Sequence, residues 1–344
     1  MRKNNPVSMM SVESANSLVS QGLKLLVAGE EGLLKQLNKG NWIGGTIPYF
    51  MSERGGVQTR GEIQVTVLPP EAKDLKILFY DEAAIHRIPE DYRSNGFSFV
   101  IIPAFSGVHH RFAKEGITWR GILDRPLVGW VSGIHLDDLG RVTPKVFNGQ
   151  TGEVSDAAAV VMHLDLPREI YAKVNIINLF EQGHDDHISF PQTGFEVEDC
   201  LINDTTQNFA DYLIDRKIDL KLPLVADYFG AKINVSVRSV DATKKVVHLY
   251  APVFSHVEYR FAKPLRNYES QFRARLDEQK IDPLFKCNCI LNYLYAELEG
   301  KKTAHMQGPI TFGEIAYMLL NQTLVYLTLE KKERGVDREP TPKI

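Results

Sequence analysis

The sequence predicts a mixed α/β protein, of the α/β or α+β class, with two related mixed-sheet domains whose sheets are covered by helices. Three observations lead to this prediction. The chain has 344 residues, 44% of them hydrophobic, and domains typically hold about 100 to 200 residues. Short apolar strands alternate with helical segments along the chain. The same order of segments occurs in both halves of the sequence.

The first part begins with a segment that we expect to be helical over residues 11–39, because leucines and valines recur near helical spacing. Residues 41–50 (NWIGGTIPYF) predict a short strand that breaks into a loop, since glycines and Pro48 prevent a helix. Residues 61–69 and 76–80 predict two further strands.

A longer apolar run, residues 97–105, predicts a strand covered on both faces. Ser106 is expected to cap a helix that follows it, and residues 125–133 predict a second strand. Residues 138–166 predict a hairpin with its turn at residues 147–153.

The second half repeats this order of strand, helix, strand and glycine-containing turn. The expected segments are a hairpin over residues 233–253, helices over 267–280 and 292–300, strands over 284–291 and 308–315, and the last strand, TLVYLTL. We therefore predict an N-terminal helical segment (1–40), two α/β domains (41–170 and 171–331) and a disordered tail (332–344).

Composition limits the function. The net charge is -3 and no basic stripe is interleaved with aromatic residues, which argues against nucleic-acid binding. Three cysteines are too few for a disulfide scaffold and suit a reducing compartment. The chain shows neither a signal-peptide apolar run nor an apolar stretch of about 18 residues. We expect a cytoplasmic protein that does not insert into membranes.

A glycine-rich segment near the end of the chain, GPITFGEIAYMLLNQTLVYLTL (308–329), resembles the C-terminal part of the FIST family of two-part intracellular sensor domains. The matching positions are Gly308, Thr311, Gly313, Glu314, Ile315 and the run Asn321, Gln322, Thr323 and Leu324. Upstream, the Phe-x-Cys-x-Gly-Arg strand end of that family falls on Phe285 and Cys287. Its Gly-Arg pair is replaced by Cys289 and Ile290, which removes an obvious anion partner.

Other segments are more loosely similar to that family and extend the resemblance from about residue 41 to residue 329. They are Phe195 to Asp215 with Tyr212, the region of Gly129, Gly133 and Asp137, and the NWIGGT segment with Gly44, Gly45 and Thr46. The resemblance implies a cytoplasmic sensory module that binds small ligands such as amino acids, with no established catalytic machinery. Because the sequence shows no kinase, chemotaxis or DNA-binding segment, we also expect a downstream signalling protein as partner.

Glu314 is the central candidate residue. We expect it in the first turn of a helix over residues 315–320, where a carboxylate interacts favourably with the helix dipole. In one interpretation, Glu314 has a structural role alone, as such a helix-start acid. Alternatively, its carboxylate contacts a ligand ammonium while nearby backbone N–H groups receive a ligand carboxylate, which are the two charges of an amino acid.

The predicted site adds residues that follow or form glycine-containing bends, where ligands approach the ends of strands. Hydroxyls there either cap backbone groups or face a pocket, and the amides of residues 321 and 322 either bond turn backbone or touch ligand. The predicted ligand-binding residues are Thr311, Gly313, Glu314, Asn321, Gly129, Ser132, Gly133, Gly45, Thr46 and Cys287.

Two rival sites are weaker. Cys287 and Cys289 share one strand face and suit packing; a nucleophilic role would need a base such as His305 or His256 nearby. The GHDDH segment (183–187) concentrates metal-capable groups but matches no zinc spacing and suits a solvated linker. Standard nucleotide, hydrolase and metalloprotease motifs are missing. We predict no cofactor, no metal and no catalysis; the alternatives are a protein-interaction adaptor, or a Cys- or metal-dependent enzyme.

Overall fold

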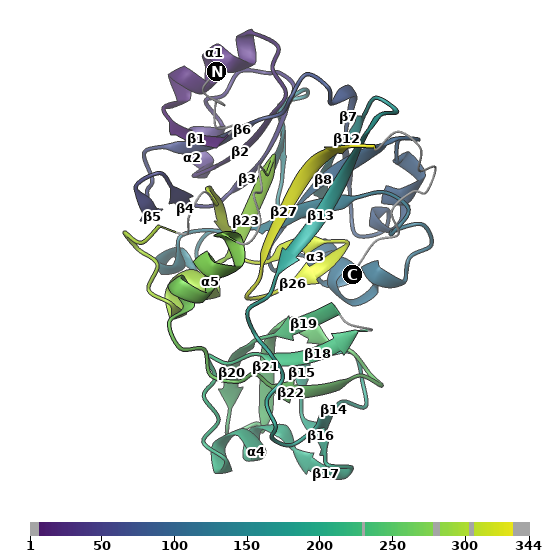
Figure 1. Ribbon diagram of the computed structural model, residues 1–344, viewed down its shortest axis with the longest axis vertical. Helices are drawn as coiled ribbons and strands as arrows, with labels where there is room; N and C mark the ends of the chain where they lie inside the picture. The colour runs from purple at the N-terminus through teal and green to yellow at the C-terminus, as the bar shows by residue number, and fades with distance from the viewer. Residues whose placement is uncertain (1–6, 229–230, 278–282, 303–305, 333–344) are drawn as a thin grey trace.

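The computed structural model describes residues 7–228, 231–277, 283–302 and 306–332. Within these residues three six-stranded sheets form a main body, and a further six-stranded sheet and a three-stranded sheet form a small domain beside it (Figure 1). The predicted mixed α/β class is confirmed, because sheets with parallel and antiparallel neighbours are combined with helices.

The N-terminal sheet has the strand order β1-β6-β2-β3-β10-β11. Its strands are β1 (Val7–Met10), β6 (Ile63–Val67), β2 (Leu25–Gly29), β3 (Trp42–Thr46), β10 (Val146–Asn148) and β11 (Glu153–Ser155). Helix α1 (Val12–Ser20) packs Ala15 and Val19 against this sheet. A short helix, α2 (Glu31–Leu34), follows β2.

The prediction of one helical segment over residues 11–39 is wrong. Leu25–Gly29 is a fully buried strand between β6 and β3, and its continuous apolar run cannot be told from a buried helix by spacing alone. The strand is parallel to β3. The chain must therefore cross back, through α2, to the end of the sheet at which β2 began before β3 can start.

The central sheet has the order β26-β25-β9-β8-β12-β7. Its strands are β26 (Met318–Leu320), β25 (Glu314–Ala316), β9 (Leu127–Ser132), β8 (Gly96–Pro103), β12 (Ala159–Asp165) and β7 (Lys73–Tyr80). β8 is buried along its whole length, as the apolar run predicts. Helix α3 (Gly107–Glu115) starts where predicted, because the Ser106 hydroxyl accepts a hydrogen bond from the backbone N–H of His109 at 3.2 Å.

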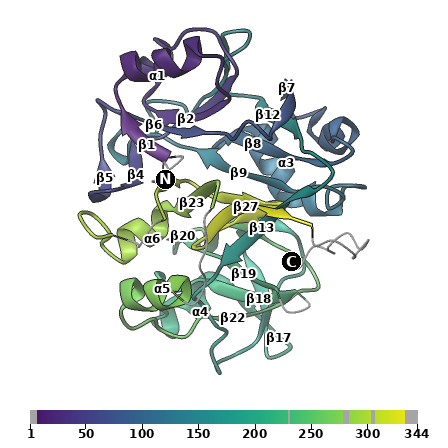
Figure 2. The same ribbon diagram turned by 45° about the horizontal axis from the view of Figure 1, so that its top comes forward.

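The C-terminal sheet has the order β13-β27-β23-β24-β4-β5. Its strands are β13 (Ile170–Ile177), β27 (Leu324–Lys331), β23 (Phe285–Cys289), β24 (Gly308–Thr311), β4 (Tyr49–Ser52) and β5 (Gly55–Gln58). The largest apolar core lies between this sheet and the central sheet, with residues such as Phe99, Trp130 and Phe285. Figure 2 shows β8 and β9, β27 and β13, and β18 and β19 as successive layers.

The two predicted domains share these last two sheets. β25 from the second half pairs with β9 from the first, and β4 from the first half pairs with β24 from the second. The predicted division between residues 170 and 171 lies within β13. Each half therefore completes a sheet of the other.

The small domain lies at the lower end of the molecule in Figure 1. Its strands are β14 (Ile188–Ser189), β15 (Gly194–Val197), β16 (Asp199–Ile202), β17 (Thr205–Asn208), β18 (Leu224–Tyr228), β19 (Ala231–Val235), β20 (Val237–Asp241), β21 (Val246–Val253) and β22 (Glu258–Phe261). Helix α4 (Phe209–Asp215) buries Phe209 and Leu213 in a core of its own. The predicted hairpin of the second half is the β20–β21 pair.

The remaining helices are α5 (Tyr268–Asp277), α6 (Ile290–Tyr295) and the 3-10 segments η1 (Ile85–Asp91), η2 (Gly116–Thr118) and η3 (Leu136–Asp138). The predicted helix over residues 315–320 is wrong: β25 and β26 form a tight hairpin there, and Tyr317 adopts a left-handed φ of 63°. The predicted disordered tail lies outside the described residues except for Lys332.

Candidate functional site

Three parallel strand pairs of the main body are β2–β3, β8–β9 and β23–β24. Their carboxyl ends lie next to one another. The backbone N–H of Gly133 donates to the carbonyl of Thr46 at 2.7 Å, and that of Val131 donates to the carbonyl of Gly313 at 2.8 Å. Ligands of open α/β sheets bind outside such strand ends, so we call this region the strand-end junction.

The structure brings residues of the predicted site from both halves of the chain together at this junction. Gly129 pairs with Ile315 in the central sheet, and the Cys287 thiol lies 3.4 Å from the carbonyl oxygen of Gly129. A Cβ atom on Gly45 would lie 3.1 Å from the Cβ atom of Ser132. The contact of these residues with a ligand stays a prediction.

The glycines of the junction are closely packed. A Cβ atom on Gly129 would lie 1.7 Å from the carbonyl oxygen of Val100, and one on Gly313 would lie 2.7 Å from the side chain of Leu319. A Cβ atom on Gly133 would lie 2.4 Å from the ring of Phe312. The glycines thus allow close packing of backbone and side chains, and the space beside each of them is filled by the protein.

Two of the predicted hydroxyls bond backbone groups. The Thr46 hydroxyl accepts from the backbone N–H of Lys145 at 2.9 Å, and the Thr311 hydroxyl donates to the carbonyl of Gly313 at 3.0 Å. The hydroxyl of Ser132 is buried and has no hydrogen-bond partner among the described residues. Of the three, Ser132 alone keeps an unused polar group at the junction.

Glu314 is the first residue of β25 and lies directly opposite Trp130 of β9. Paired residues of antiparallel strands project to the same face, so the carboxyl group enters the layer between the central and C-terminal sheets. It has no exposed surface. One oxygen, Oε2, accepts hydrogen bonds from the hydroxyl of Thr323 at 2.8 Å and from its backbone N–H at 3.2 Å.

Burial raises the pKa of Glu314 to about 8, because a carboxylate loses its hydration in this layer. The hydroxyl and backbone N–H of Thr323 and the neighbouring thiol of Cys289 lower the pKa but do not offset burial. At pH 7 the carboxyl group is therefore mostly protonated. The expected ionised acid near a helix dipole is replaced by a neutral acid on a buried strand.

Four buried polar atoms of the junction have no hydrogen-bond partner among the described residues. They are Glu314 Oε1, Asn321 Oδ1, Trp130 Nε1 and Ser132 Oγ. Three are acceptors or hydroxyls and one, the indole N–H, is a donor only. Buried polar atoms in proteins are nearly always hydrogen-bonded, so this concentration marks the junction as the candidate site.

The junction continues into the contact with the small domain. Asn234 on β19 donates from Nδ2 to the carbonyl of Asn321 at 3.2 Å, and it exchanges two side-chain hydrogen bonds with Asn178 at 2.8 and 3.0 Å. The Ser236 hydroxyl donates to Gln322 Oε1 at 2.9 Å. Thr323, which bonds the Glu314 carboxyl group, directly follows Asn321 and Gln322 in the chain. The carboxyl group is therefore linked through Thr323 to the residues that contact the small domain.

The cysteines of the rival site are buried. Burial raises the pKa of Cys287 and of Cys289 well above the usual value, and the neighbouring Glu314 acts in the same direction. Burial also raises the pKa of Cys200 to about 12. Thiols with raised pKa values are poor nucleophiles near neutral pH, which disfavours the cysteine-based alternative. The proposed base His305 lies outside the described residues.

The GHDDH segment makes structural contacts. Asp186 accepts hydrogen bonds from Asn203 at 2.6 Å and from the Tyr212 hydroxyl at 3.2 Å, while His187 lies 3.7 Å from Asp204. Across the described residues, no group of three or more His, Cys, Asp or Glu side chains is arranged to hold a metal ion.

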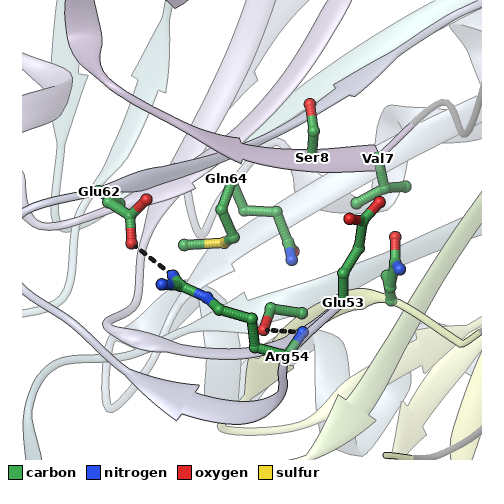
Figure 3. Close-up of a pocket in the computed structure, with 9 residues that line it drawn as sticks. Val7, Ser8, Glu53, Arg54, Glu62 and Gln64 are labelled. Atoms are coloured by element: carbon green, nitrogen blue, oxygen red, sulfur yellow. Dashed lines mark hydrogen bonds and ion pairs between the residues drawn. The ribbon is translucent and has the colours of Figure 1, made fainter.

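A surface cavity of about 250 Å³ lies away from the junction, between β1, β6 and the turn that joins β4 to β5 (Figure 3). Three of its side chains are charged, and Arg54 is paired with Glu62 at 3.0 Å. The lining residues are Val7, Ser8, Met9, Ser52, Glu53, Arg54, Glu62, Gln64 and Gln307. No local sequence pattern indicates this cavity, because its lining comes from segments far apart in the chain.

The chain matches one protein family along most of its length. The model of a family of unknown function, DUF6976, matches residues 10–330, which is most of the sequence. The chain belongs to this family. The DUF6976 match includes every strand of the junction. No match was found among the curated proteins.

The DUF6976 family has no described function, so the resemblance to FIST domains stays a prediction. Among the described residues, no helix combines the length and the apolar character that crossing a membrane requires. Two residues beside Glu314, Trp130 and Thr323, are not among the predicted ligand-binding residues. Both lie in segments that the sequence singles out, but only the folded structure pairs Trp130 with Glu314 across two strands and brings the Thr323 hydroxyl to the Glu314 carboxyl group.

Proposed function

We propose that this chain is a non-catalytic, cytoplasmic sensor that binds a small ligand of amino-acid type at the strand-end junction and signals to a protein partner. The observation that supports it most is the concentration of four partnerless polar atoms around the buried Glu314. A ligand with its own donors and acceptors would satisfy these atoms. The similarity of the Glu314 segment to FIST sensor domains points in the same direction.

Entry of a ligand requires a change of conformation, because Glu314, Thr311 and Ser132 have no exposed surface. The adjoining small-domain contact has a polar part, with Asn234 and Ser236 on one side and Gln322 on the other. It also has an apolar part, because Ile233 and Ala251 of the small domain are buried in the cores of the main body. In our proposal the small domain separates from the main body here. A ligand that favours the open state would shift the population toward it, and this shift would be the signal.

The raised pKa of Glu314 gives this proposal a measurable property. A ligand ammonium beside the carboxyl group favours its charged form and lowers its pKa from about 8. Binding at pH 7 would then release up to one proton from the protein. A ligand that only accepts a hydrogen bond from the neutral acid would release none.

The first experiment is a thermal-shift screen of amino acids and related metabolites on the parent protein and on Glu314→Gln. A ligand of the junction raises the melting temperature of the parent and has little effect on the variant. Equal shifts in both proteins would remove Glu314 from the binding site. Any hit is then titrated calorimetrically in two buffers of different ionisation enthalpy, which measures proton release directly.

The contact with the small domain is tested separately. Asn234→Ala removes hydrogen bonds to Asn178 and to the carbonyl of Asn321, so the open state should gain population and amide exchange near β19 should speed up. Asn175→Ala is the matched control, because among the described residues its half-buried side chain bonds only the neighbouring backbone of Lys173. If no metabolite shifts the parent but a stable partner is isolated, the adaptor alternative replaces the sensor.

A further inference from the structure

The surface cavity of Figure 3 is formed by segments that are far apart in sequence. β1 forms one wall, and the β4–β5 turn with Glu53 and Arg54 forms another. Gln307, directly before β24, closes the cavity from the second half of the chain. A hollow that several elements of the folded protein hold in place is a better candidate for binding than a groove within a single loop.

The charge of the lining favours a cation. Two carboxylates, Glu53 and Glu62, face the cavity with one guanidinium, that of Arg54. Arg54 neutralises Glu62, since its Nη2 lies 3.0 Å from Glu62 Oε2. Glu53 has no ion pair or hydrogen bond with any residue that the structure describes. One negative charge of the cavity is therefore unmatched.

Gln64 supplies a second and independent feature. Its side chain is only 2% exposed, and its Nε2 donates to the carbonyl of Met51 at 3.2 Å. This bond fixes the orientation of the amide, so its oxygen must be the free end. Oε1 is buried and has no hydrogen-bond partner within the described chain. Figure 3 shows the amide lying between Arg54 and Glu53.

We propose that this cavity binds a small primary amine, with the ammonium group held between the Glu53 carboxylate and the Gln64 amide oxygen. An ammonium has three donors and no acceptor, which fits a lining that offers an unmatched carboxylate and an unused carbonyl. Val7 and Met9 provide apolar contacts for a short alkyl chain. The volume of about 250 Å³ limits the ligand to a few heavy atoms. This site is distinct from the strand-end junction and does not depend on the proposed function.

The test is calorimetric titration of the full-length protein at low ionic strength with butylamine, 1,4-diaminobutane and butyrate. Both amines should bind and butyrate should not. Glu53→Gln should weaken amine binding by about tenfold, because it removes the charge with little change in shape. Glu71→Gln is the matched control, since Glu71 is exposed and does not line the cavity.

Gln64→Met tests the second contact, because methionine has a similar length and no amide oxygen. It should also weaken amine binding, and circular dichroism establishes that the variant is folded. Since Glu53 is exposed, Glu53→Gln keeps the proposal testable even if the Gln64 variant does not fold. Binding of butyrate as tight as that of butylamine, or unchanged amine affinity in Glu53→Gln, would overturn the proposal.

Discussion

Thr323 donates two hydrogen bonds to one oxygen of Glu314, from its hydroxyl at 2.8 Å and from its backbone N–H at 3.2 Å. Thr323 lies in the turn between β26 and β27, so these bonds join the edge hairpin of the central sheet to the C-terminal sheet. They leave Oε1 of Glu314 unused. One oxygen of the acid is therefore fixed by Thr323, while the other is buried without a hydrogen-bond partner among the described residues.

The raised pKa of Glu314 should make the protein less stable as pH rises. Between its ordinary pKa of 4.5 and about 8, the folded state keeps a proton that the unfolded state has lost. The stabilising contribution is complete below pH 4.5 and is lost as pH rises through 8. A change of this size corresponds to about 5 kcal/mol. Urea unfolding from pH 5 to 9 should show this decrease in the parent.

Glu314→Gln should remove this part of the pH dependence, because glutamine does not titrate. The difference in free energy of unfolding between variant and parent should grow in favour of the variant toward pH 9. Glu71→Gln serves as control, and its difference from the parent should stay constant. A constant difference for Glu314→Gln would show that the acid is already ionised in the folded state.

His163 should have the opposite effect on stability. It is buried between Ser98 and Tyr80, whose hydroxyls lie 2.8 Å from Nδ1 and 3.0 Å from Nε2. Burial lowers its pKa to about 4, so it stays neutral while an unfolded histidine gains a proton. Its contribution is complete above pH 6.5, and about 3 kcal/mol is lost as pH falls to 4. Ring signals in an NMR titration should not move between pH 8 and 5.

Two glycine substitutions should have opposite outcomes. Gly129→Ala places a Cβ atom 1.7 Å from the carbonyl oxygen of Val100, where backbone of a central strand cannot yield, and we expect a loss of about 3 kcal/mol or more. Gly32→Ala meets no atom within 4 Å in helix α2 and should be neutral or stabilising by up to about 1 kcal/mol. Chemical denaturation of both variants measures the contrast, and equal stabilities would contradict the packing at Gly129.

The three cysteines should react slowly with a thiol reagent in the native protein. Cys200, Cys287 and Cys289 are buried, and burial raises the pKa of each thiol. Labelling at pH 7.5 should therefore follow unfolding, with all three thiols reacting rapidly in denaturant. Fast modification of Cys287 in the folded protein would favour the enzyme alternative.

Much of the strand pattern could be read from the sequence, because β8, β9, β23 and β27 are short apolar runs with clear ends. The helix over residues 315–320 could not be excluded in this way. The three residues on each side of Tyr317 form a hairpin because β25 pairs with the edge of β9. This pairing joins segments far apart in the chain, so local sequence preferences do not indicate it. The misread β2 has the same cause, since it becomes a strand between β6 and β3.

The sequence could indicate which residues belong to the candidate site, but not their arrangement or their protonation. Glycine-containing strand ends correctly indicated segments that meet, such as those of Thr46 and Gly133. The protonation of Glu314 could not be foreseen, because it depends on complete burial and on the neighbouring Thr323 and Cys289. The surface cavity depends on the contact of β1 with the β4–β5 turn, and no local pattern in the sequence reports such a contact.

The pairing of β25 with β9 bears on how the protein is made. The strand that completes this edge of the central sheet comes from residues 314–316, so β9 has no partner on that side while most of the chain is being synthesised. An unpaired apolar edge is prone to association with other chains. A nascent polypeptide that stalls before residue 314 would leave this edge open on the ribosome, and chaperones would be needed most at that stage.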